Sequence, residues 1–301
     1  MEWAGPERLA AAAKTSREFY AGRAPGRGPR SAAELAAVRA AAPAPASVAP
    51  PPVVEVVEAD GHRVGVRIQV PRDRPAAGVL LELHGGGFYL GSAAASDVRN
   101  RRLVDDLGVA VASVDYRLAP EHPWPAAPED CEAAAQWLTE VATTRFGTDR
   151  IALIGFSAGS TLAMTTLLRL RERARLPIAG AVLQFGTYDL SGTTEAGRLI
   201  DNEWFLDAYA ADAPDRTDPD LSPVFAAVTD LAALPPVLMV VGADDILLHD
   251  NVAMAERLRD AGVRVDLRVY PEAPHGFTAH PTPLAGAAQD EIDAWLTERL
   301  Q

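Results

Sequence analysis

The sequence predicts an α/β fold in which a mostly parallel central sheet is covered by helices on both faces. From about residue 79 to the end of the chain, short apolar runs alternate with longer segments of helical character. Such alternation is typical of parallel strands joined by crossover helices. The 301 residues, 48% of them hydrophobic, suffice to bury a substantial core in one domain, with or without a lid.

The chain begins with helical segments and a hairpin. Residues 7–40 are rich in Ala, Glu and Arg and predict one or two helices, and the Gly/Pro break at 22–26 favours two. A stiff Pro/Ala linker at 42–52 leads to strands at 53–58 and 63–70, which predict a hairpin around Asp60-Gly61. Later strands are predicted at 79–83, 109–114, 151–154, 180–185, 237–241 and 265–269, and helices near 97–107 and at 128–145, 158–173, 250–261 and 285–299.

Residues 155–159 read Gly-Phe-Ser-Ala-Gly directly behind the apolar run 151–154. A strand that ends in Gly-x-Ser-x-Gly and opens into a helix is typical of a nucleophile elbow. This strained turn presents a serine hydroxyl at the top of the sheet. Glycines are needed on either side because side chains there would collide with neighbouring backbone. Ser157 is therefore the predicted nucleophile.

A second glycine-rich loop follows the predicted strand 79–83 and reads His-Gly-Gly-Gly-Phe-Tyr. Acyl transfer needs N–H donors directed at the oxygen that becomes negative in the tetrahedral intermediate, and bare glycines supply them without obstruction. In lipases and esterases such a loop forms the oxyanion hole with the amide that follows the nucleophile. We therefore predict Gly86, Gly87 and Ala158 as donors. A phosphate cradle is disfavoured because no Gly-Lys-Ser/Thr or Gly-x-Gly-x-x-Gly pattern follows.

An acid and then a histidine are expected after the serine. Asp244 and Asp245 follow the apolar run 236–241, and His275 lies in a Pro/Gly-rich loop after the last predicted strand. His275 would act as general base and then general acid, while a carboxylate fixes its tautomer. The chemistry alone does not choose between the two adjacent aspartates.

Together these motifs resemble the hormone-sensitive-lipase-like (HGGG, type IV) esterases of the α/β-hydrolase superfamily. The resemblance covers nearly the whole chain and extends to Asp115–Ala127, Leu221–Pro223, Gly242–Leu247 and His275–Phe277. It implies an α/β-hydrolase fold with a helical cap. The cap would comprise N-terminal helices within 1–50 and an insertion at about 188–222 of a catalytic domain at 51–301. It also implies Asp245 as the acid, with Asp244 as a solvated or turn-stabilising neighbour.

The elbow departs from the family's usual Gly-Asp-Ser-Ala-Gly-Gly at Phe156 and Ser160. Phe156 should make the wall beside the nucleophile more apolar and change substrate preference. The predicted substrate-binding residues are Phe88, Tyr89, Phe156, Trp204 and Tyr209, and the cap would also bring Trp3, Phe19, Tyr20 and Phe205 near the pocket. The alternative for each cap aromatic is that it only holds the cap to the body. Glu82 lies in a strand that should be buried, so we expect its carboxylate to be hydrogen-bonded or partly solvated.

Composition restricts the partners. The net charge of −13 argues against nucleic acid and anionic membrane surfaces. No run approaches the roughly 18–20 apolar residues of a membrane span, and residues 1–8 show no signal-peptide pattern. Cys131 is the only cysteine, so no intramolecular disulfide can form, which suits the cytoplasm, where we expect the protein. A homodimer through the last strands is implied by the resemblance alone.

We therefore predict a serine carboxylesterase that hydrolyses small esters of short to medium acyl chains through an acyl-enzyme, without metal or organic cofactor. One alternative is an amide, N-acetyl or O-acetyl deacylase of a small metabolite that uses the same triad. Another is a non-catalytic ligand-binding homologue. The second is disfavoured because serine, acid and histidine are all present.

Overall fold

The computed structural model describes residues 6–22, 28–59, 61–172, 177–200 and 203–301. Trp3, Asp60 and most of the predicted break at 22–26 lie outside the described residues, as do the last residue of the predicted helix 158–173 and two residues of the predicted cap insertion.

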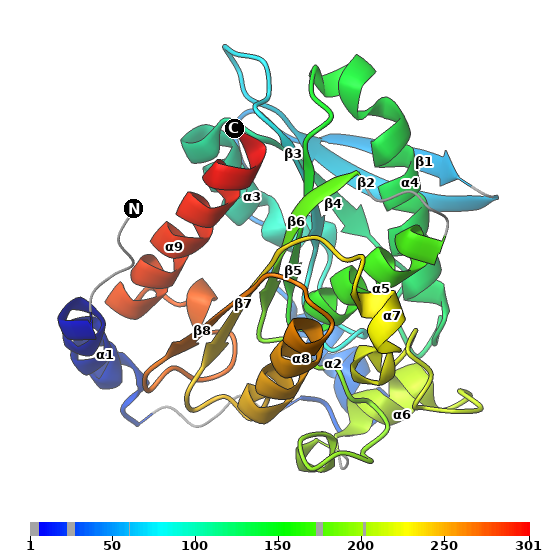
Figure 1. Ribbon diagram of the computed structural model, residues 1–301, viewed down its shortest axis with the longest axis vertical. Helices are drawn as coiled ribbons and strands as arrows, with labels where there is room; N and C mark the ends of the chain where they lie inside the picture. Colours follow the sequence, from blue (N-terminus) through cyan, green and yellow to red (C-terminus); the bar gives the residue numbers. More distant parts are fainter. Residues whose placement is uncertain (1–5, 23–27, 60, 173–176, 201–202) are drawn as a thin grey trace.

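One mixed sheet of eight strands, within the described residues, forms the centre of the molecule (Figure 1). Its strands are β1 (Val53–Ala59), β2 (His62–Gln69), β3 (Val79–Leu83), β4 (Ala110–Asp115), β5 (Ile151–Phe156), β6 (Ile178–Gln184), β7 (Val237–Gly242) and β8 (Val265–Tyr270). Their spatial order is β1-β2-β4-β3-β5-β6-β7-β8. The pairs β1–β2 and β2–β4 are antiparallel and the other five are parallel, which confirms the predicted antiparallel start.

Helices cover both faces of this sheet, as predicted. The longer ones are α1 (Pro6–Tyr20), α2 (Ala32–Ala41), α3 (Asp97–Leu107), α4 (Ala126–Phe146), α5 (Ala158–Glu172), α8 (Leu248–Asp260) and α9 (Pro283–Leu300). Residues of α4, α5 and α8 enter the core on one face, and residues of α3 and α9 enter the core on the other. The central strand β3 is buried along its whole length, because both of its faces are covered.

Several short helices were not predicted. They are η1 (Ala93–Ser96), η2 (Gly197–Leu199), η3 (Pro223–Phe225), α7 (Val228–Leu231) and η4 (Phe277–Ala279). They span three or four residues each, which is too short for a hydrophobic period to emerge. By contrast, α6 (Trp204–Ala210) lies within the insertion at about 188–222 that is expected to contribute to a helical cap.

The two N-terminal helices lie apart. Helix α1 packs beside α9, whereas α2 lies near α6, next to the loop that follows β3 (Figure 1). No helix in the described part of the chain has both the length and the apolar character to cross a bilayer.

Candidate active site

The Ser157 turn has the geometry expected of an elbow. Ser157 has φ of +54°, a left-handed conformation, between the end of β5 and the first residue of α5. A Cβ at Gly155 would lie 2.4 Å from the Gly159 carbonyl oxygen, and one at Gly159 would lie 2.0 Å from that of Leu83. Both glycines are therefore required by close backbone approach. The Ser157 amide donates to Gln184 O at 2.9 Å and ties the turn to β6.

Three loops from distant parts of the chain meet at Ser157. Its Oγ lies 2.9 Å from His275 Nε2, and His275 Nδ1 lies 2.9 and 3.1 Å from the two Asp245 carboxylate oxygens. The Asp245 carboxylate is fully buried, accepts from the Leu247 amide at 2.9 Å, and faces a partly exposed imidazole. Asp244 is exposed. The structure therefore brings Asp245, and not its neighbour, to the histidine.

A buried aromatic side chain supports this imidazole. The edge of the Phe185 ring meets His275 with centroids 5.0 Å apart and planes at 70°. Phe185 is fully buried and has φ of +38°, because it follows the last residue of β6 where the chain turns away. Sequence reasoning missed it. Its one signal was an apolar residue at the carboxyl end of a predicted strand, a place where loops carry function.

The glycine loop presents free amides beside the serine. Gly86 and Gly87 have φ of +129° and +59°, and a Cβ at Gly86 would lie 2.1 Å from Leu90 O. Within the described residues, neither amide has a hydrogen-bond acceptor. Ala158 is the first residue of α5, where helical amides lack intrahelical partners. All three predicted donors thus lie on the loop and helix end that flank Ser157.

His84, the first residue of this loop motif, supports the backbone. It is buried and stacks on Tyr116, with ring centroids 4.1 Å apart, and its Nδ1 lies 2.9 Å from Gly85 O. The Tyr116 hydroxyl also donates to His84 O at 2.7 Å. Burial lowers the pKa of His84, so the ring is neutral. Tyr116 belongs to the Asp115–Ala127 block, which therefore acts as a scaffold for the loop.

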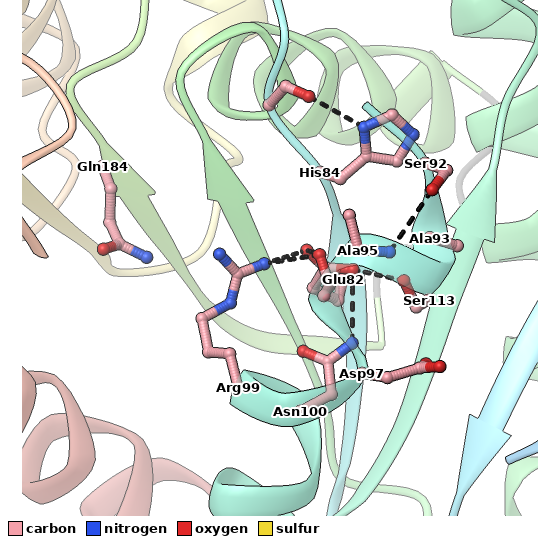
Figure 2. Close-up of polar contacts among 12 residues, drawn as sticks. Glu82, His84, Ser92, Ala93, Ala95, Asp97, Arg99, Asn100, Ser113 and Gln184 are labelled. Carbon is pink, nitrogen blue, oxygen red and sulfur yellow. Dashed lines mark hydrogen bonds and ion pairs between the residues drawn. The ribbon is translucent and has the colours of Figure 1, made fainter. Parts of the chain in front are cut away.

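The buried Glu82 carboxylate forms a polar cluster beneath the loop (Figure 2). Oε1 accepts from Ser96 Oγ at 3.0 Å and from Arg99, while Oε2 accepts from Ser113 Oγ and from Asn100 Nδ2 at 3.5 Å. The expectation of a hydrogen-bonded carboxylate is confirmed. The Arg99 guanidinium in turn lies 5.0 Å from the Phe156 ring centroid, so the cluster reaches the residue before Ser157.

Two of the predicted substrate-binding residues lie in the core. Phe88 and Tyr209 are buried and stack on each other, with centroids 3.9 Å apart and planes at 6°. Their rings join the glycine loop to α6. Phe88 is fully buried in this contact, so we replace the expectation of substrate contact by a packing role for both residues. An apolar ring is equally suited to a pocket wall and to a core, and the sequence does not separate the two.

The other three predicted pocket residues differ in burial, because Phe156 and Trp204 are partly exposed, whereas Tyr89 is buried in the core. Phe156 is partly exposed and meets the Phe185 ring edge-on at 4.6 Å. The centroids of the Tyr89 and Trp204 rings lie 5.8 Å apart, and Trp204 is partly exposed. Burial, helped by the negative charge of Glu203, raises the pKa of Tyr89 to about 12, so its hydroxyl stays protonated.

The assembled groups are suited to nucleophilic acyl transfer. A serine hydroxyl can pass its proton to the imidazole, a buried carboxylate can stabilise the resulting imidazolium, and free amides can donate hydrogen bonds to the developing oxyanion. Among the described residues, no group of three or more His, Cys, Asp or Glu side chains is placed to hold a metal ion.

Comparison with known proteins agrees with this fold. A family model described as alpha/beta hydrolase fold matches residues 80–279. The ethyl acetate hydrolase of Pseudomonas putida is 37% identical over 235 residues, 72% of this chain and 72% of that protein. The carboxylic ester hydrolase LipN of Mycobacterium tuberculosis is 35% identical over 266 residues, 81% of this chain and 70% of that protein.

A solved structure extends the likeness to nearly the whole molecule. A Pyrobaculum calidifontis esterase matches with a TM-score of 0.75 at 28% identity, and the match covers 98% of this chain and 97% of that one. The predicted resemblance is confirmed. The chain belongs to the α/β-hydrolase fold family that contains the hormone-sensitive-lipase-like esterases.

Proposed function

We propose that this protein is a serine carboxylesterase that hydrolyses small esters of short to medium acyl chain length. The observation that carries the proposal is the continuous hydrogen-bonded array from Ser157 Oγ through His275 to the buried Asp245 carboxylate. The similarity to proteins named ethyl acetate hydrolase and carboxylic ester hydrolase supports the choice of an ester as substrate.

In the proposed reaction, His275 Nε2 takes the Ser157 proton as Oγ attacks the ester carbonyl. The amides of Gly86, Gly87 and Ala158 stabilise the oxyanion, and the imidazolium then protonates the departing alcohol. A water molecule deprotonated by His275 attacks the acyl-enzyme, and the acid leaves as Oγ regains its proton. Asp245 holds the imidazole tautomer throughout, and every step uses groups of this chain.

Aromatic side chains near the glycine loop favour a short substrate. A Cβ at Gly87 would lie 3.6 Å from the Phe205 Cβ, so α6 covers the loop closely. Of the N-terminal helices expected in the cap, we keep only α2 beside the 188–222 segment, because α1 packs beside α9. Arg39 of α2 and Trp204 and Phe205 of α6 contact the same loop residue, Tyr89. The partly exposed Phe156 and Trp204 remain the proposed substrate contacts, whereas the buried Tyr89 packs in the core as Phe88 and Tyr209 do.

Two further parts of the proposal concern the cellular location and the oligomeric state of the protein. The single cysteine, which is buried and free, suits a cytoplasmic location. Strand β8 is an edge of the sheet, which would allow a second copy to pair with it. Sedimentation analysis of the purified protein tests the dimer, and a monomer at micromolar concentration contradicts it.

Hydrolysis of p-nitrophenyl acetate and butyrate, compared with the matching anilides, tests the activity. We expect ester turnover that Ser157→Ala abolishes, together with fluorophosphonate labelling at Ser157. Equal or faster anilide turnover would replace the esterase by an amidase. Full activity in Ser157→Ala would refute the mechanism.

A further inference from the structure

Arg39 of the N-terminal helix α2 contacts the loop that follows β3. The Arg39 guanidinium donates from Nε and Nη2 to the Tyr89 carbonyl oxygen, at 3.0 and 2.9 Å. Nη2 also donates to Ala119 O at 2.7 Å, and Nη1 pairs with the Glu121 carboxylate at 2.6 Å. One guanidinium therefore joins the cap helix, the loop after β3 and the segment after β4.

The loop that Arg39 contacts has a costly backbone conformation. Three successive residues, Gly86, Gly87 and Phe88, have positive φ, and Phe88 at +64° is not a glycine. A left-handed non-glycine residue costs about 1–3 kcal/mol and persists only where its surroundings hold it. The loop therefore depends on contacts from outside for the orientation of its amides.

In the described part of the chain, few hydrogen bonds from outside reach the backbone of residues 86–89. The Gly86 carbonyl accepts from the Tyr89 and Leu90 amides at 3.2 and 2.8 Å, within the loop itself, and the Phe88 carbonyl accepts from Ala119 at 3.0 Å. Among the described residues, Arg39 is the only donor to the Tyr89 carbonyl. Because Arg39 also binds Ala119 O, it joins the loop to the same residue whose amide binds the neighbouring Phe88 carbonyl.

We propose that Arg39 is a positioning residue for the oxyanion hole, which holds the Gly86–Phe88 loop so that its amides face the reacting carbonyl. The inference rests on the proposed function and assigns α2 a role in it. Helix α2 would then be required for transition-state stabilisation as well as for covering the pocket. Arginine suits this task because its planar donors satisfy two carbonyls and a carboxylate in one fixed geometry, which a lysine ammonium does not reproduce.

Steady-state kinetics with p-nitrophenyl butyrate test the proposal on Arg39→Ala and Arg39→Lys. Small displacements of oxyanion donors strongly reduce transition-state stabilisation. We therefore expect kcat of Arg39→Ala to fall about 10- to 100-fold, with KM changed less than about twofold. The kcat of Arg39→Lys should lie between those of the wild type and Arg39→Ala. Millimolar guanidinium chloride should restore part of kcat in Arg39→Ala, because the ion can occupy the vacated donor position, whereas methylammonium should not.

Glu121→Gln is the matched control. It removes the charge pair at the exposed side but keeps both carbonyl contacts of Arg39, so its kcat should stay within about twofold of the wild type. Circular dichroism and thermal unfolding establish that each variant is folded. If Arg39→Ala does not fold, the kcat of Arg39→Lys tests the proposal instead.

Three results would overturn the inference: an unchanged kcat in a folded variant, a loss confined to KM, or no recovery with guanidinium. Failure of the proposed function is seen separately, as a wild-type protein that hydrolyses no ester.

Discussion

Removing Arg99 from the Glu82–Arg99 pair should destabilise the protein at least as much as removing both partners, because it leaves the buried carboxylate without its counter-charge. The Glu82 side chain is 1% exposed, and that of Arg99 is 30% exposed. Arg99→Met keeps an aliphatic stem but leaves the carboxylate buried with neutral donors only. Breaking a buried pair in this way costs about 3–5 kcal/mol, and we expect the lower end because Ser96, Ser113 and Asn100 still donate.

Glu82→Gln should be milder. The remaining Arg99 is partly exposed and can turn toward water, so the loss should be about 1–2 kcal/mol. In the double variant no buried charge is left, and we expect the free energy of unfolding to fall by about 2–3 kcal/mol relative to the wild type. The sum of the single effects then exceeds the double effect by about 2 kcal/mol, which is the coupling energy of the pair.

Urea unfolding of the four proteins, followed by fluorescence and circular dichroism, measures this cycle. Coincident transitions are needed to apply a two-state analysis. The matched control is the surface pair of Arg145 and Glu55, whose side chains are 32% and 35% exposed. Its coupling should be below about 1 kcal/mol. A Glu82–Arg99 coupling no larger than that of the control would refute the argument from burial.

Three further predictions concern single residues. Burial raises the pKa of Asp250 to about 6, above its ordinary 3.8, so its contribution to stability is full below pH 4 and is lost as the pH rises through 6. Asp250→Asn should therefore gain up to about 3 kcal/mol relative to wild type between pH 4 and 7 in urea unfolding, and a constant difference would contradict this. Phe185→Leu should lower kcat about 10-fold at similar KM, because the ring edge no longer orients His275, and unchanged ester kinetics would contradict this. Gly159→Ala should cost more than about 3 kcal/mol, because its Cβ would lie 2.0 Å from Leu83 O, and a wild-type melting temperature would disprove the clash.

Motif reasoning located the turns and loops whose shape depends on local backbone. The elbow needs positive φ at Ser157 and glycines at fixed offsets, and the glycine loop needs left-handed residues in succession. These requirements lie within a few residues, so they appear as short patterns. The same holds for the strands, because burial on both faces demands continuous apolar runs.

Contacts between side chains could not be predicted in the same way, because they depend on the tertiary structure. Asp244 and Asp245 are adjacent residues of the same type, so the chemistry of the sequence does not separate them. The turn after β7 decides which carboxylate faces His275. Phe88 and Tyr209 were expected to contact substrate, but their rings pack against each other. Burial, and not residue type, determines whether an aromatic ring binds or packs.

The amino-acid sequence by itself determined the alternating architecture, the nucleophile turn, the glycine loop and the order of acid and histidine. Only the tertiary structure decided that Arg39 meets Tyr89, that Phe185 supports His275 and that Arg99 neutralises Glu82. The physical reason is distance along the chain. Backbone conformation is set by neighbouring residues, whereas a hydrogen bond or ring contact between distant segments exists only after the sheet and its helices have brought those segments together.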